Sequence, residues 1–274
     1  KSFAGGVPLV GKAWGNPNFR FLDKYISDKA TEEHTLRFGS KKYLSPSFKT
    51  RMMERLLSAR VSSDKSYRYS DLNFILLQQV IERVSGEPLD EFVTKYIYRP
   101  IQARLYFNPL ERGVKIQQIA PAQHDTFLRG EILRGTVDDE AAACLGGVSG
   151  NAGLFGAAEE LLLQHGAWGK KQVIPSSTVR LFTETTSASG IRALGFDKPR
   201  PSGGPTGIYA SSATYGHQGF TGTCFWVDPK YDLIFIFLSN RTYPTRQNTT
   251  LIRERLRQRL QDLVYEAVGA TTPR

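Results

Sequence analysis

Cysteine is scarce in this chain of 274 residues, and a long hydrophobic run is absent from it. The two cysteines, Cys144 and Cys224, belong to no CxxC pair and have no histidine at ligand spacing, so the sequence predicts no metal site. A disulfide between them stays open, but two small buried hydrophobic side chains suit their apolar neighbours better. The longest apolar run, residues 233–238, has the length of a strand, whereas a membrane-spanning helix needs about 20 residues. We therefore expect no transmembrane span.

Sequence repeats and the GxGxxG pattern of dinucleotide-binding folds are also missing. This excludes a solenoid, disfavours a dinucleotide fold and leads us to expect no cofactor. What is present is typical of a folded globular protein: 40% of the residues are hydrophobic and 11% are aromatic.

The chain is basic, with 36 lysines and arginines against 26 acidic residues and a net charge of +10. A nucleic acid, an anionic membrane or an anionic polymer could bind such a chain. The densest basic cluster comprises Arg253, Arg255, Arg257 and Arg259, at alternate positions that do not share one helical face. Acidic residues interrupt it and no aromatic platform accompanies it, so we interpret it as a solvated face and expect no nucleic-acid partner.

Helical periodicity is followed by strand periodicity along the chain, which predicts an α+β fold. The apolar helix that starts at Asp71 is expected to be buried deep in the fold and to end at Gly86 in a left-handed cap. We expect helices over residues 46–58, 71–85, 88–99, 159–165 and 176–182, strands over 215–219, 223–227 and 233–239, and a closing helix over 251–267.

These elements suggest four regions. Residues 1–49 are expected to form an irregular arm or specificity excursion, and residues 50–214 a mainly helical region. Residues 215–268 would contribute the C-terminal antiparallel strands and the closing helix of the same domain, followed by a tail over 269–274.

Two short constellations carry residues suited to chemistry. Tyr69-Ser70-Asp71 lies at the start of the apolar helix, where Ser70 or Asp71 could simply be the N-cap. His217-Gln218-Gly219 lies on the first strand of the final meander, where a lone histidine is more often structural. Each constellation alone is weak evidence of a site, but their order along the chain is informative.

Taken in order, these motifs and the Gly-rich stretch 146–154 resemble the serine β-lactamase and penicillin-binding-protein family. The likeness covers residues 50–268, is strongest over 67–89, 146–154 and 215–240, and is greatest to the class C, D-aminopeptidase and esterase branch. It extends to the branch fused behind glycoside hydrolases of the β-N-acetylglucosaminidase type. The resemblance implies a β-lactamase/transpeptidase-like fold, in which an antiparallel sheet flanked by helices accompanies a helical region, incomplete here at the N-terminus.

The resemblance also implies roles for individual residues. Tyr69 would shuttle a proton to or from the nucleophile and the leaving group, helped by a cationic neighbour, and His217 would position or protonate the leaving group. A backbone N–H near Gln218 or Gly219 would help to form an oxyanion hole. Asp71 replaces the usual asparagine of the family, so that an acceptor-only carboxylate stands at a catalytic position.

Two further residues of the Gly-rich stretch, Ser149 and Asn151, would bind substrate together with Gln218 and Gly219. The nucleophile of the family lies in a Ser-x-x-Lys motif well upstream of the tyrosine. Ser62 and Lys65 fit that spacing, but they lie only a few residues before Tyr69 and no apolar helix follows them. We interpret Ser62 as a chance match and expect the nucleophile outside this chain.

The leading hypothesis is therefore a serine hydrolase domain that acts by acyl transfer on a peptidoglycan peptide, a β-lactam or an ester, in the periplasm or cell envelope. Its expected partners are the missing N-terminal segment, which would cover the apolar strand edge at 233–239, or a fused glycoside hydrolase domain. The alternative is a non-catalytic module that binds cell-wall fragments or supports that glycosidase, so enzymatic activity stays open.

Overall fold

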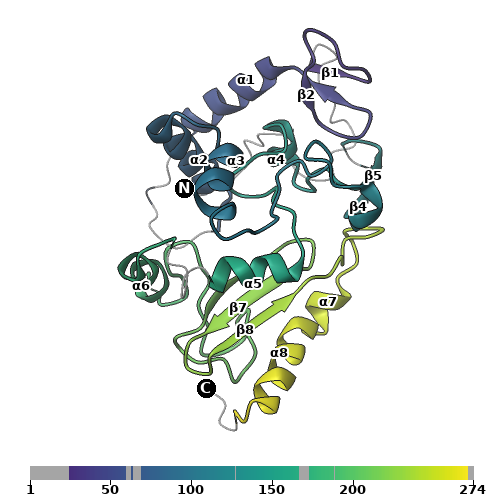
Figure 1. Ribbon diagram of the computed structural model, residues 1–274. Coiled ribbons are helices and arrows are strands. Elements are labelled where there is room, and N and C mark those ends of the chain that lie inside the picture. The colour runs from purple at the N-terminus through teal and green to yellow at the C-terminus, as the bar shows by residue number, and fades with distance from the viewer. Residues whose placement is uncertain are drawn as a thin grey trace. The chain divides into compact units, whose positions relative to one another are not determined.

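The computed structural model describes residues 25–59, 63, 69–126, 128–166, 173–187 and 189–270. The chain divides into two compact units (Figure 1). We call the first, Lys1–Lys95 with Leu105–Phe155, the helical unit, and the second, Tyr96–Arg104 with Gly156–Arg274, the sheet unit. The N-terminal part of the expected arm, residues 1–24, lies outside the described residues.

The helical unit combines helices with short strands. Strands β1 (Ile26–Ser27), β3 (Tyr43–Leu44) and β2 (Leu36–Arg37) pair in that order in a small antiparallel sheet that the sequence did not lead us to expect. The remaining elements are α1 (Pro46–Leu57), α2 (Leu72–Ser85), α3 (Leu89–Val93), the 3₁₀ turn η3 (Ile116–Gln118), the hairpin β4 (Gln123–Asp125) and β5 (Glu131–Leu133), and α4 (Glu140–Cys144). A π-helical turn, η2 (Thr94–Tyr98), follows α3.

Helix α2 starts and ends as predicted but does not lie deep in the fold. Gly86 forms the left-handed cap at φ 73°. Of the helix, only Ile75 and Gln78 are fully buried, whereas Leu77, Val80 and Val84 are 50%, 55% and 83% exposed. The expectation of deep burial is wrong for the described residues, because the helix packs through a face that includes a glutamine and turns an apolar stripe outward.

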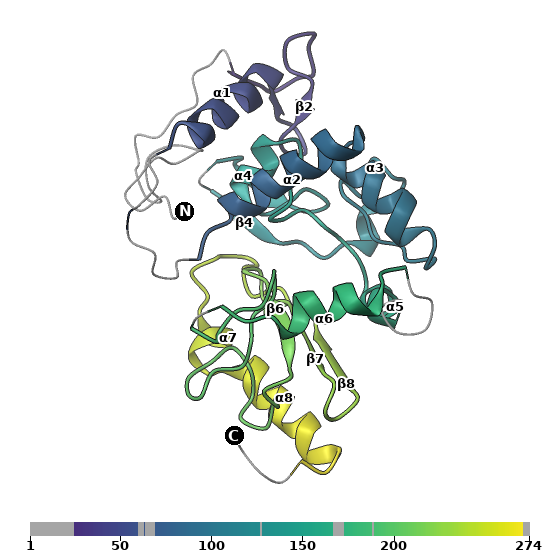
Figure 2. The same cartoon turned by 90° about the vertical axis from the view of Figure 1, so that its left-hand side faces the viewer.

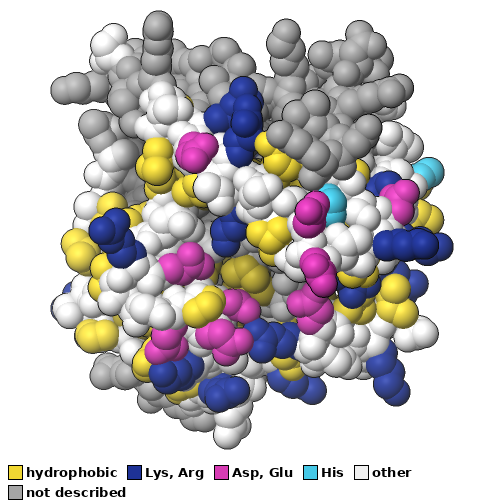
Figure 3. All heavy atoms as spheres, turned by 90° about the horizontal axis from the view of Figure 1, so that it is seen from above, with side chains coloured by type: hydrophobic (Ala, Val, Ile, Leu, Met, Phe, Trp, Pro, Cys, Tyr) yellow, Lys and Arg dark blue, Asp and Glu magenta, His cyan; other side chains and the backbone are white. Residues whose placement is uncertain are grey.

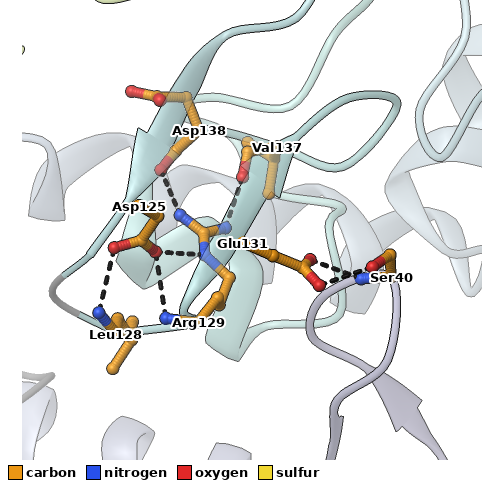
Figure 4. Close-up of polar contacts among 7 residues, drawn as sticks. All are labelled: Ser40, Asp125, Leu128, Arg129, Glu131, Val137 and Asp138. Carbon is orange, nitrogen blue, oxygen red and sulfur yellow. Dashed lines mark hydrogen bonds and ion pairs between the residues drawn. The ribbon is translucent and has the colours of Figure 1, made fainter. Parts of the chain in front are cut away.

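A buried ion pair organises the hairpin of the helical unit (Figure 4). Arg129 Nε donates to Asp125 Oδ2 at 2.7 Å, and both side chains are almost completely buried. The two outer nitrogens of Arg129 donate to the carbonyls of Val137 and Asp138 at 2.6 and 2.7 Å. Figure 4 shows Glu131 pointing away from this group toward Ser40. The Glu131 carboxylate accepts hydrogen bonds from the N–H and the hydroxyl of Ser40. Arg129 thereby donates hydrogen bonds to backbone carbonyls at positions that lie outside the described helices and strands.

The sheet unit is a meander flanked by helices. Strands β6 (Tyr215–Gln218), β7 (Cys224–Asp228) and β8 (Leu233–Phe237) pair antiparallel in that order, as predicted, and β8 lies at the edge of the sheet. In Figures 1 and 2, α8 (Leu256–Ala267) runs along one side of this sheet and α5 (Ala158–Gly166) lies on the other. Helix α6 (Ser176–Glu184) precedes the loops that lead to β6.

The closing helix differs from the prediction in two ways. It is broken into α7 (Thr250–Arg253) and α8 (Leu256–Ala267) at Arg255, which has a φ of 50°. Its buried residues are Leu251 in α7 and Arg257, Gln261 and Tyr265 in α8, whereas Leu263 is 60% exposed. Burial follows hydrogen bonding here, because all three polar residues reach partners in the loops and strand ends of the sheet unit.

Asp228, at the end of β7, is the partner of Tyr265. Its carboxylate accepts from the Tyr265 hydroxyl at 2.7 Å and from both the N–H and the hydroxyl of Ser211. Burial acts to raise the pKa of this carboxyl, but these hydrogen bonds outweigh it and lower the pKa below its ordinary value.

Among the coloured side chains in Figure 3, which belong to the described residues, dark blue, magenta and yellow are interspersed and no large positive patch is seen. Among the helices of the described residues, none has the length and hydropathy that a membrane crossing requires.

We predict that Arg129→Met lowers the free energy of unfolding by about 3–5 kcal/mol, since it leaves the buried Asp125 carboxylate without its counter-ion. Urea denaturation followed by circular dichroism measures the loss. Arg112→Met is the matched control: Arg112 pairs with Asp90 and Glu91 at the surface and should cost no more than about 1 kcal/mol. Equal losses in both variants would contradict the assigned role of Arg129.

Asp228 predicts a pH-dependent contribution to stability. Because its pKa is lowered in the folded state, the ionised carboxyl contributes stability above the unfolded pKa of about 4, and this is lost as the pH falls through the folded value. Wild type should therefore be more stable than Asp228→Asn at pH 6, and urea midpoints should converge below pH 4. A difference that stays constant down to pH 3 would disprove this.

Candidate functional site

Tyr69 and Asp71 lie where the chain enters α2. Tyr69 is 59% exposed. The Asp71 carbonyl accepts from the N–H groups of Phe74 and Ile75, but its carboxylate makes no capping bond. The Ser70 hydroxyl accepts from Leu72 N–H at 3.3 Å. Of the two capping candidates, Ser70 serves the helix, so the carboxylate of Asp71 is not used as a cap.

The Gly-rich stretch forms a tight loop whose polar groups bond to one another. Ser149 is buried, and its hydroxyl donates to Asn151 Oδ1 at 2.6 Å. Asn151 Nδ2 in turn donates to Asp139 Oδ1 at 3.4 Å, and Asp139 caps α4 through Ala142 N–H. The structure thus brings Ser149 and Asn151 together through their own hydrogen bond and through the contact of Asn151 with Asp139.

Gln78 fastens this loop to α2. Its amide nitrogen donates to the Val148 carbonyl at 3.3 Å, and its amide oxygen accepts from Gly150 N–H at 3.1 Å. Gly150 lies so close to the helix that a Cβ there would collide with the Phe74 carbonyl oxygen. The loop therefore rests directly on the backbone of the helix that follows Tyr69.

His217, in β6, is held in one tautomer. Its Nδ1 lies 2.9 Å from the Gln218 carbonyl oxygen, which can only accept, so Nδ1 carries the proton. In the neutral ring the lone pair is then on Nε2, which lies 3.9 Å from Asp197 Oδ2. The ring is thus oriented with Nδ1 toward the Gln218 carbonyl and Nε2 on the side of Asp197.

Asp197 is itself anchored beside β6. Its N–H donates to the Gly216 carbonyl at 2.7 Å, its carbonyl accepts from Gly216 N–H at 3.2 Å, and its carboxylate pairs with Arg192. Because the hydrogen-bonding direction alternates along a strand, the Gln218 N–H faces the same outer edge as that of Gly216. Gly219 N–H instead donates to the Thr223 carbonyl at 2.8 Å. Of the two oxyanion-hole candidates, the Gln218 N–H is the one directed away from β7.

The side chain of Gln218 is fixed at both ends. Its Nε2 donates to the Pro205 carbonyl at 2.6 Å, and its Oε1 accepts from Arg257 at 2.9 Å. A Cβ on Gly219 would collide with the Thr223 hydroxyl oxygen, so the turn requires glycine at this position.

Sequence reasoning missed several residues that shape these clusters. Arg257, read as part of a solvated face, is buried, whereas Arg253, Arg255 and Arg259 are exposed as expected. Asp197 and Gln78 lie outside any motif, and only their tertiary partners reveal them. The chance match at Ser62 and Lys65 lies outside the described residues.

The two cysteines are free and buried, in agreement with the preferred interpretation. Burial raises the pKa of Cys144 well above its ordinary value and that of Cys224 to about 11. The described residues contain no group of three or more His, Cys, Asp or Glu side chains that could hold a metal ion.

The family model described as Beta-lactamase matches residues 16–259. The chain belongs to the β-lactamase family. Its members include serine hydrolases of the penicillin-binding-protein type, so the family expected from the motifs is confirmed.

A curated relative from Escherichia coli K12 carries the name "Putative D-alanyl-D-alanine carboxypeptidase" and is 36% identical over 198 residues. The match covers 64% of this chain and 45% of that protein, so the chain spans less than half the length of this relative.

Two solved structures show the fold. A β-lactamase from Mycobacterium bovis aligns with a TM-score of 0.53 at 20% identity, over 77% of this chain and 68% of its own. A simvastatin synthase from Aspergillus terreus aligns with a TM-score of 0.53 at 15% identity, over 83% and 66%. The predicted α+β, β-lactamase/transpeptidase-like fold is thereby confirmed.

We predict that Gln78→Leu releases the loop around Gly150, since it leaves the Val148 carbonyl and the Gly150 N–H without partners at a cost of about 1–3 kcal/mol each. Hydrogen exchange at residues 148–151 should accelerate. Gln79→Leu is the control, because Gln79 contacts only Glu82 among the side-chain bonds described for it. Unchanged exchange in Gln78→Leu would show that the loop is held by packing alone.

Proposed function

We propose that this chain is part of a serine hydrolase that acts by acyl transfer, with the nucleophile supplied by a segment outside it. The observation that carries the proposal is the end of β6. There, a histidine with its proton fixed on Nδ1 stands beside a backbone N–H directed to the outer edge of the strand. In a β-lactamase-family chain, this combination suits proton transfer and the stabilisation of an oxyanion.

The substrate class we propose is a peptidoglycan-derived peptide, and a β-lactam or an ester is also within reach of the same chemistry. The name of the Escherichia coli relative supports a peptide as the substrate, because D-alanyl-D-alanine is a dipeptide. Such a substrate would place the protein in the periplasm or elsewhere in the cell envelope.

In the proposed reaction, a serine attacks the carbonyl carbon of the scissile amide or ester and its proton passes to a base. The tetrahedral intermediate collapses to an acyl-enzyme, and the leaving group departs with a proton. Tyr69 would accept the proton of the nucleophile, and His217 Nε2 would pass to the leaving group a proton that it has first taken up from solvent. Water then releases the acyl group by the reverse order of proton transfers.

The partner we propose is the segment that carries Ser-x-x-Lys. A strand edge in one unit and an apolar stripe in the other support its association with this chain. In the sheet unit, the backbone groups of Ile234 and Ile236 face the outer edge of β8, because those of Phe235 pair with β7. In the helical unit, the exposed stripe of Leu77, Val80 and Val84 faces outward from α2. A fused glycoside hydrolase domain is a further partner that the motif resemblance supports.

A non-catalytic module that binds cell-wall fragments is the second candidate. The observation in its favour is Asp71, where a carboxylate stands in place of the family's asparagine. Its exposed position at the start of α2 would place a negative charge at the site.

The deciding experiment exposes this chain, and a longer form that includes upstream sequence, to a fluorescent penicillin and a fluorophosphonate, followed by intact mass spectrometry. We expect a covalent adduct on the longer form only. Tyr69→Phe and His217→Asn should each slow labelling by about 10²–10⁴-fold. Tyr96→Phe, an exposed tyrosine outside the proposed site, should leave it unchanged.

Labelling of this chain alone would refute an external nucleophile. If neither form is labelled although both are folded, the hydrolase is refuted and the binding module is favoured.

A further inference from the structure

In the loop that joins β6 to β7, each backbone carbonyl from Gly219 to Thr223 accepts a hydrogen bond. The Phe220 and Thr221 carbonyls accept from Arg241, through its Nε and its backbone N–H. The Gly222 carbonyl accepts from the Ser239 hydroxyl at 2.9 Å.

The Gly219 and Thr223 carbonyls accept from the N–H groups of Gly222 and Gly219, and Arg257 adds further bonds from the first turn of α8. Its Nη1 donates to the Gly219 carbonyl at 3.3 Å and to the Thr223 carbonyl at 3.0 Å, and its Nη2 donates to Gln218 Oε1 at 2.9 Å. The side chain is 7% exposed, and all three of these acceptors are neutral oxygens. A planar guanidinium can serve acceptors in such a fork, which an ammonium cannot.

Arg241 holds the other side of the same turn. Its guanidinium lies 4.4 Å from the centre of the Phe220 ring and also donates to the carbonyls of Arg246 and Asn248. The two arginines thus donate hydrogen bonds to the turn from separate segments of the chain. Arg241 follows β8, and Arg257 lies in α8.

These contacts determine which groups at the end of β6 can contact a ligand. Arg257 and Pro205 together use both polar atoms of the Gln218 side chain, so that residue can offer a ligand its backbone rather than its amide. Its N–H is directed to the outer edge of β6, the edge on which Asp197 pairs with Gly216. An extended, peptide-like substrate can pair with a strand edge of this kind through its own amide groups.

We propose that Arg257 is a positioning residue for substrate: it fixes Gln218 and Gly219 so that the outer edge of β6 pairs with the backbone of a peptide-like acyl substrate. The proposal rests on the proposed function. It commits to a substrate with at least one amide group beside the scissile carbonyl, in contrast to a small ester, which reaches the reacting atoms without pairing along the strand.

The first test needs no activity. In this chain, Arg257→Met should accelerate hydrogen exchange of the Gly219 and Gly222 amides by about tenfold or more, with the Trp226 and Phe235 amides unchanged. Arg259→Met, an exposed neighbour in the same helix, is the matched control. Unchanged exchange at Gly219 and Gly222 would overturn the proposal, whether or not the protein is a hydrolase.

The second test uses the longer form that carries the nucleophile. Arg257→Met should lower kcat/KM by about 10–100-fold for a peptide ending in D-Ala-D-Ala and by less than threefold for p-nitrophenyl acetate. The difference between the two losses corresponds to about one hydrogen bond between the strand and the peptide substrate. An equal loss for both substrates would show a merely structural role and overturn the proposal. If the methionine variant does not fold, Arg257→Lys keeps the charge but not the fork and should change the two substrates in the same unequal way, to a smaller degree.

Wild type that hydrolyses neither substrate would refute the proposed function. The exchange experiment would still decide whether Arg257 fixes the turn.

Discussion

Irregular backbone must find donors for its carbonyl groups, and buried arginine side chains meet this constraint in both units. Arg129 serves the segment after β5, and Arg241 and Arg257 serve the turn after β6. Arg134 adds a bond to the Ile119 carbonyl. The turn after Gln218 depends on Arg241 and Arg257, whereas the loop around Ser149 is held by Gln78.

This use of arginine gives the basic composition a structural meaning. A net charge of +10 suggests an anionic partner when only the sequence is known. In the structure, part of that charge is directed inward, to carbonyl oxygens and to a buried carboxylate. The charge of the chain is therefore a poor measure of the charge on its surface.

The elements that the sequence predicted well are those with local signals. The helix that ends at Gly86 and the three-stranded meander were predicted close to their observed bounds, because a cap residue and a period of two are visible without tertiary information. The faces of α2 and α8 were not predictable in this way. Gln78 and Arg257 are buried because of hydrogen-bond partners far along the chain, and hydrophobic periodicity assigns such residues to solvent.

The same distinction applies to the candidate site. Tyr69 and His217 stand in short motifs and could be singled out from sequence, whereas Asp197 and its bond to the strand beside His217 required the fold. A role that one residue exerts through the orientation of another has no local sequence signature. For this reason the residues that position the motifs were found only in the structure.

The free cysteines have a practical consequence. One thiol is buried in each unit, and the thiolate is the reactive form, so the raised pKa values and the burial together protect both from alkylating agents and oxidants while the units are folded. The alkylation rate of Cys144 then reports the opening of the helical unit and that of Cys224 the opening of the sheet unit. The native chain thereby contains separate chemical probes for the cooperativity between its two halves.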